Sequence, residues 1–271
     1  AATLDRLFAK RNLIFTILFS AYCVGCLALM SDFGTALIFF VAFLCIAFLR
    51  TGDLPSIVMI TAAAGFAGGI VLRFKPYVLA RFAVWRHAWE YAQEEGYQQT
   101  RTMSAVASGG LFGAGPEEAW LKYVGAANTD LVFGVVSEEF GLLLALCAAA
   151  AVILLGIYAL RAAGRSRSSF YAIAACATAA MLVFQTTLNV LGSVDLLPLT
   201  GVTFPFVSMG GSSMLSCWGL LAYLQAAAPP PVSVKAAPKA PAPAVKPPQA
   251  TGFLDELGVA TDDIFGKEDA R

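Results

Sequence analysis

The feature that most constrains this chain is a series of long apolar runs with almost no charge inside them. A helix needs about 20 apolar residues to cross the hydrocarbon core of a bilayer. Six runs approach or exceed that length, at residues 12–30, 33–49, 54–72, 129–161, 168–192 and 206–227. Charged residues make up 13% of the sequence, against roughly a quarter in soluble domains. We therefore predict an all-α, polytopic membrane helix bundle with six spans.

The positions of arginine and lysine in the short connections predict how these spans are oriented. Cationic residues gather before the first span, between the second and third, between the fourth and fifth, and after the sixth. The opposite short connections, 31–32 and 193–205, contain neither Lys nor Arg. Because Lys and Arg favour the cytoplasmic side, we expect the long polar loop at about 73–128 to be external. The C-terminal tail is then cytoplasmic.

Composition divides the chain into three regions. Residues 1–227 form the membrane bundle with its external loop, and residues 228–250 are an Ala/Pro/Lys-rich linker. Residues 251–271 are acidic with a few apolar side chains. This last region fits either a solvated tail or a short partner-binding helix.

The external loop contains two features with alternative interpretations. Val78, Phe82, Trp85 and Trp89 recur at helical spacing, which predicts a helix in the headgroup region or against the protein's own outer surface. A glycine-rich stretch then covers residues 108–115. Its backbone amides could form an anion-binding nest, or its glycines could serve only tight turns.

The loop ends in Asn128, Thr129 and Asp130, at the start of the longest apolar run. All three residue types cap helices well, so Asp130 is either an N-cap or a carboxylate held at the membrane surface. Glu138 and Glu139 follow about two turns deeper, where carboxylates are costly and usually face a cavity or a partner. Asp32 is a further acid at an external helix junction, and capping of the second span is the favoured interpretation of it.

Composition also excludes some functions. The formal net charge is +0, so nucleic acid has no electrostatic case as a partner. The chain has one histidine, His87, and its six cysteines lie in apolar runs, which argues against a His- or Cys-based metal site. A divalent cation such as Mg²⁺ or Mn²⁺ stays open, although no ligand cluster demands one.

Taken in order, the motifs resemble the FtsW/RodA/SpoVE family. The matching segments are residues 32–36, 96–98, 108–113, 129–130, 138–141, 197–201, 204–208 and 210–213, with Gln185 and Asn189. Asn128 stands where the family has a histidine, whereas the aspartate of its motif is kept as Asp130. The resemblance implies a ten-span fold with both termini cytoplasmic, of which the last six spans are present. We therefore expect a fragment without four helices, and one that is inactive by itself.

The resemblance also implies an activity. The family polymerises lipid II outside the bacterial plasma membrane, as a peptidoglycan glycosyltransferase that serves division or cell shape. Undecaprenyl pyrophosphate leaves, and a class B penicillin-binding protein is the partner. A flippase for lipid-linked precursors and a non-catalytic scaffold for a penicillin-binding protein are the alternatives.

The family's essential carboxylate maps onto Asp130, which is therefore the candidate catalytic base. Positive charge or amides must receive the departing pyrophosphate, and Arg73, Lys75 and the Gly109–Gly115 amides are further candidates for this role. The candidate substrate-binding residues are Arg101, Lys122, Ser108, Gly109, Gly110, Thr129, Glu138, Glu139, Ser208, Gly210, Gly211 and Ser212.

Overall fold

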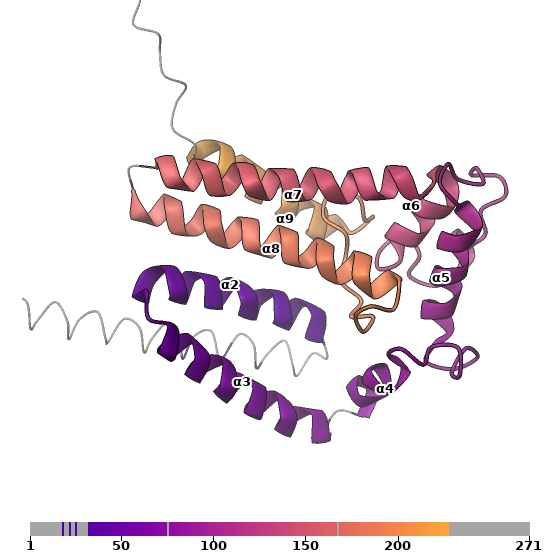
Figure 1. Cartoon of the computed structure of the whole chain (residues 1–271), viewed down its shortest axis with the longest axis horizontal. Coiled ribbons are helices and arrows are strands. Elements are labelled where there is room, and N and C mark those ends of the chain that lie inside the picture. The colour runs from indigo at the N-terminus through magenta and orange to yellow at the C-terminus, as the bar shows by residue number, and fades with distance from the viewer. Residues whose placement is uncertain are drawn as a thin grey trace, which may run out of the picture. The chain divides into compact units, whose positions relative to one another are not determined.

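The computed structural model describes Leu18, Tyr22, Gly25 and residues 32–74, 76–166 and 168–227. Within these ranges the chain forms helices and turns without strands, which confirms the all-α prediction (Figure 1). The α-helices are α2 Phe33–Thr51, α3 Leu54–Phe74, α4 Pro76–Val84, α5 Tyr97–Gly109, α6 Val132–Phe140, α7 Leu142–Arg165, α8 Ser169–Ser193 and α9 Gly211–Ala227. A 3-10 turn, η1, covers Leu121–Tyr123.

Three helices of the described part are long and apolar enough to cross a membrane, namely α2, α7 and α8. The apolar stretch of α3 is shorter, at Leu54–Phe66, and α9 has 17 residues. The second, third, fifth and sixth predicted spans thus correspond to α2, α3, α8 and α9. Most of the first predicted span lies outside the described residues, as do the linker and the acidic tail.

The fourth predicted span, at 129–161, is wrong as a single helix. It consists of α6 and α7, which are separated at Gly141 with φ 91°. A Cβ on Gly141 would overlap the backbone of Leu111, because the preceding loop crosses the chain here. Leu142 N donates to Gly110 O at 2.9 Å across this junction. Hydropathy averaged along the run hides the break, since apolar residues on both sides outweigh Glu138 and Glu139 just before it.

The main core lies where α6, α7, α8 and α9 meet. α7 packs chiefly against α8, and α8 also packs against α2 (Figure 1). The buried core residues are Val132, Phe133, Ala145, Ala149, Val152, Leu182, Phe204 and Cys217. The small residues among them allow close helix approach. Since Phe133 and Phe204 share this core, the start of α6 is fixed against the loop that follows α8.

α2 begins against the same loop. Asp32 caps it, with Oδ1 accepting a hydrogen bond from Thr35 N at 3.0 Å, which confirms the favoured interpretation of Asp32. A Cβ on Gly34 would overlap Val202, so the first turn of α2 touches this segment closely. The N-terminus of α2 therefore lies near the beginning of α6.

The helix at the start of the long polar loop ends earlier than its pattern predicts. α4 ends at Val84, and Arg86 adopts φ 64°, which helices exclude. The prediction that this helix continues through Trp85 and Trp89 is therefore wrong. Val78 and Val84 are buried, whereas Trp89 is 65% exposed. The helix thus packs partly on the protein itself.

Candidate active site

Asp130 lies in a tight turn immediately before α6. The backbone N–H groups of Asp130 and Leu131 donate to Ala126 O at 2.9 and 3.3 Å, and Ala126 has φ 65°. Leu131 takes the cap position of α6, with no side-chain capping bond. The N-cap interpretation of Asp130 is therefore wrong, and its carboxylate is not used by the helix terminus.

Three hydrogen bonds attach this turn to α8 and to the loop between α8 and α9. Asn189 Nδ2 donates to Asp130 O at 2.9 Å. Ser208 Oγ lies 2.6 Å from Thr129 O, to which it donates. Met209 N donates to Asn128 O at 2.8 Å. The structure thus brings Ser208 next to Thr129 and Asp130. These candidate residues come from two separate motifs of the sequence.

The Asp130 carboxylate lies against Gly201 and near Arg81. A Cβ on Gly201 would lie 3.3 Å from Asp130 Oδ2 and 3.6 Å from Arg81 Nη1. Gly201 has φ 73°, a conformation that glycine adopts without strain. Arg81 Nη1 donates to Leu199 O at 2.7 Å, so the loop that holds Gly201 also positions the guanidinium. Arg81 from α4 and Asp130 from the start of α6 thus both lie against the loop that follows α8.

The surroundings of Asp130 raise its pKa. Desolvation of the half-buried carboxyl is the largest cause, and the nearby Asp32 carboxylate acts in the same direction. The Thr129 side chain and the Arg81 charge lower the pKa, but they do not cancel the desolvation. A carboxylate with a raised pKa binds a proton more strongly than a solvated aspartate, which suits a general base.

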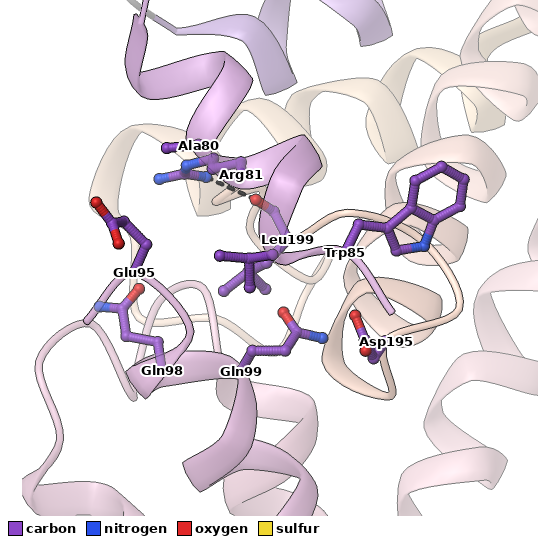
Figure 2. A pocket seen from close by; sticks show the side chains of 9 residues that line it. Ala80, Arg81, Trp85, Glu95, Gln98, Gln99, Asp195 and Leu199 are labelled. Carbon is purple, nitrogen blue, oxygen red and sulfur yellow. Dashed lines mark hydrogen bonds between the residues drawn. The ribbon is translucent and has the colours of Figure 1, made fainter. Parts of the chain in front are cut away.

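A pocket of about 250 Å³ adjoins this site (Figure 2). It lies between α4, the start of α5 and the loop after α8. Arg81, Glu95, Gln98, Gln99, Asp195 and Leu199 are among the residues that line it. Arg81 therefore belongs both to the wall of the pocket and to the surroundings of Asp130.

Comparison with known proteins identifies the family. A family described as cell cycle protein, FtsW/RodA/SpoVE, matches residues 5–229. The chain belongs to the FtsW/RodA/SpoVE family. This membership and the apolar helices make it a membrane protein, and they confirm the resemblance seen in the motifs.

Curated relatives of this FtsW/RodA/SpoVE chain are named as peptidoglycan glycosyltransferases. The chain is 33% identical over 204 residues to the peptidoglycan glycosyltransferase RodA of Mycobacterium leprae, covering 74% of this chain and 43% of the relative. It is 30% identical over 218 residues to the probable peptidoglycan glycosyltransferase FtsW of Bacillus subtilis, covering 74% and 52%. The chain thus spans about half the length of the curated relatives it matches.

The fold also matches a solved structure. A chain from a peptidoglycan synthase complex that coordinates polymerization and crosslinking superposes with a TM-score of 0.61 at 24% identity. The match covers 78% of this chain and 60% of the other. The helical arrangement described above is therefore the fold of this family.

The glycine-rich stretch of the family motif lies at the far end of α6, about 12 Å along the helix from Asp130 at about 1.5 Å per residue. A Cβ on Gly109 would overlap Ser137 O. Gly113 N donates to Gly109 O, Ala114 N to Glu138 O, and Gly115 N to Glu139 O. These three amides are therefore occupied within the protein. At these three amides the glycine-rich stretch serves close packing and tight turns, and the prediction that they form an anion-binding nest is wrong.

Glu138 has a structural position at the same end. It is 1% exposed, and its two carboxylate oxygens accept from Trp120 N at 3.1 Å and Leu121 N at 2.9 Å. Unpaired buried backbone amides are costly, so Glu138 fixes the η1 turn against α6. Glu139, beside it, is only partly buried.

The remaining predicted residues divide into two groups. The Arg101 guanidinium lies 5.1 Å from the Tyr97 ring centroid, and Lys122 Nζ donates to Pro116 O, both away from Asp130 on the α5 and η1 side. Ser108 is exposed there, and its hydroxyl donates to Ala105 O. α9 begins with Gly211 and Ser212, and Gly210 directly precedes it. These residues follow the loop between α8 and α9 that is bonded to the Asp130 turn. Substrate contact by any of these residues stays a prediction.

Two residues that interact with Asp130 cannot be identified as its neighbours from the sequence. The charge of Arg81 acts on Asp130 through space, but it is one of several cations in the loop. Asn189 belongs to a family motif, yet only the structure reveals its bond to the Asp130 backbone. Among the described residues, no group of three or more His, Cys, Asp and Glu side chains is placed to hold a metal ion.

Proposed function

We propose that this chain carries the catalytic site of a peptidoglycan glycosyltransferase that polymerises lipid II at the outer face of the bacterial plasma membrane. The single observation that supports this best is the Asp130 carboxylate, which is half-buried, has a raised pKa and is left free by the helix that follows it. The names of the curated relatives agree with this reaction class.

In this proposal Asp130 acts as the general base. It takes the proton from the 4-hydroxyl of the acceptor N-acetylglucosamine as that oxygen attacks the anomeric carbon of the donor. The bond from the anomeric carbon to the pyrophosphate breaks, and undecaprenyl pyrophosphate leaves with the electron pair. General base catalysis contributes about 10²–10⁴-fold. The Arg81 charge lowers the pKa of Asp130 and so favours the ionised form that acts as the base.

The proposal also covers the orientation of the chain in the membrane and its protein partner. The loop at 73–128 faces outward and the C-terminal tail inward, in agreement with the distribution of Lys and Arg. The site then lies where lipid II is presented. A class B penicillin-binding protein would crosslink the product, and the similarity to a chain of a peptidoglycan synthase complex agrees in fold with such an assembly.

The test uses the protein at its full natural length, purified with its penicillin-binding protein and supplied with labelled lipid II. We expect glycan chains from the wild type and none from Asp130→Asn. Asp53→Asn is the matched control, because Asp53 lies beyond the opposite end of α2 and is exposed. Equal polymer from the wild type and Asp130→Asn would contradict the role of Asp130.

The same preparation separates the alternatives. Transport of lipid II across vesicles without polymer would favour a flippase. Stimulation of a separate synthase by both the wild type and Asp130→Asn, with no polymer from either alone, would favour a scaffold.

A further inference from the structure

The pocket beside Arg81 has a surface with an unusual balance of hydrogen-bonding groups. Gln98 Nε2 donates to Gly125 O at 3.2 Å, and Gln99 Nε2 donates to Gly192 O. Each glutamine therefore uses one of its two amide N–H groups on the backbone, which leaves one N–H donor and the carbonyl oxygen for a ligand. Figure 2 shows both side chains on the α5 side of the pocket, with Gln98 near Glu95, Gln99 pointing toward Asp195, and Arg81 on the opposite side.

Two carboxylates add further acceptors. Asp195 uses Oδ1 to accept from Arg86 N at 3.2 Å, which leaves its second oxygen. Glu95 is exposed at the edge of the pocket. Arg81 supplies the cationic donors, and one of its nitrogens is already bonded to Leu199 O. The wall thus contains one cation and two anions, so its net charge is negative, and it offers both acceptor oxygens and N–H donors to the hydroxyl groups of a ligand.

This balance selects the class of ligand. The net negative charge of the wall disfavours phosphate and pyrophosphate groups. Acceptor oxygens bind groups that donate, and several hydroxyls on one ring provide such donors in a fixed arrangement. Ala80, Val84 and Leu199 give the pocket an apolar wall for the C–H face of a ring. Its volume of about 250 Å³ is below the usual range for drug-sized ligands, about 300–1,000 Å³, and suits a single ring.

We infer that this pocket is a subsite for one uncharged sugar ring. That the ring belongs to the glycan substrate rests on the function proposed above, because Arg81 joins the pocket to the surroundings of Asp130. A ring held here would anchor a saccharide whose neighbouring part reaches the carboxylate, so the pocket would contribute to positioning.

The test is ligand-detected saturation-transfer NMR on the protein at its full natural length, with N-acetylglucosamine as the probe. Ala80→Phe fills the pocket from α4, and we expect it to reduce the saturation signal at least tenfold. Ala83→Phe, on the same helix but exposed and outside the pocket lining, should keep the wild-type signal. An equal signal from Ala80→Phe and wild type, or no signal from wild type, would overturn the inference.

A second variant guards against misfolding of Ala80→Phe. Glu95→Lys changes an exposed side chain and makes the wall net positive. We expect it to weaken binding of N-acetylglucosamine and to strengthen binding of its 1-phosphate. Unchanged preference between the two probes would count against the charge argument and against this site.

The binding readout is independent of catalysis. If the protein binds the sugar but makes no polymer, the subsite stands and the polymerase proposal fails. If it makes polymer and Ala80→Phe binds the sugar normally, the polymerase proposal stands and the subsite fails.

Discussion

The side-chain amide of Asn189 donates to the backbone oxygens of Asp130 and Val202 at once, at 2.9 and 2.7 Å. Asn189 is 2% exposed and lies in α8; its bond to Val202 O is buried, and its bond to Asp130 O is partly buried. One side chain of a membrane helix therefore holds the turn before α6 and the loop after α8 at a fixed separation. The position of the Asp130 carboxylate depends on this bridge.

Asn189→Leu should lower both stability and activity. It removes the donor from a buried and a partly buried carbonyl group, and an unsatisfied buried group costs about 1–3 kcal/mol. We expect a lower Tm in detergent and a fall in the polymerisation rate of at least tenfold. Thr187→Val is the control, because Thr187 Oγ1 bonds only within its own helix, to Val183 O. A wild-type Tm and rate for Asn189→Leu would refute the bridge.

Arg81→Gln should shift the pH dependence of polymerisation upward. In the proposed mechanism activity requires ionised Asp130, so activity falls as the pH drops through the pKa of this group. The Arg81 charge lowers that pKa, and glutamine removes the charge while retaining an amide that can donate to Leu199 O. The acid limb of kcat/KM should move to higher pH, whereas Arg81→Lys should leave it near the wild-type position. An unmoved acid limb in Arg81→Gln would mean that the two groups are not coupled.

Asp32→Asn should shift the same limb in the opposite direction. The Asp32 carboxylate raises the pKa of Asp130, so its neutralisation lowers that pKa and extends activity to lower pH. Asparagine caps helices as well as aspartate does, so α2 should keep its first turn and its Tm. A limb that moves upward, or not at all, would exclude Asp32 as a neighbour of the reacting carboxylate.

Sequence alone predicts α2, α3 and α8 well, because each is a run of apolar residues with charged or turn-forming residues at its ends. It does not predict where α6 separates from α7. Val132–Phe140 is as apolar as the run that follows, and the break depends on the crossing of residues 110–112 over Gly141.

The candidate site shows a similar division. Asp130 is found from its motif, whereas the approach of Arg81 requires the fold of the 197–201 loop, which no local pattern encodes. Glu138 satisfies the rule that deep carboxylates need partners, but its partners are the backbone amides of Trp120 and Leu121. Hydropathy predicts how deep in an apolar run such a carboxylate lies, but only the packing of the fold determines which groups the carboxylate contacts.

Gly109→Ala should destabilise the protein without a specific effect on substrate binding. The added methyl group would overlap Ser137 O, and overpacking costs about 1–3 kcal/mol or more. Gly125→Ala is the matched control, since a Cβ there meets nothing within 4 Å. Thermal unfolding should show a lower Tm for Gly109→Ala alone. An unchanged Tm combined with a higher KM for lipid II would instead restore a direct substrate role for this stretch.

The joint at Gly141 separates the part of the chain that must match the bilayer from the part that carries Asp130. α7 has 24 residues and is about 36 Å long, whereas a hydrocarbon core is about 30 Å thick. Such a mismatch is relieved by tilting or by local thickening of the lipid. α6 packs against α5 as well as against α7, so a change in the tilt of α7 reaches α6 across a bend and is opposed by contacts on its other side. We therefore expect turnover to depend only weakly on the acyl-chain length of the surrounding lipid, because the joint reduces the movement that membrane thickness transmits to the carboxylate.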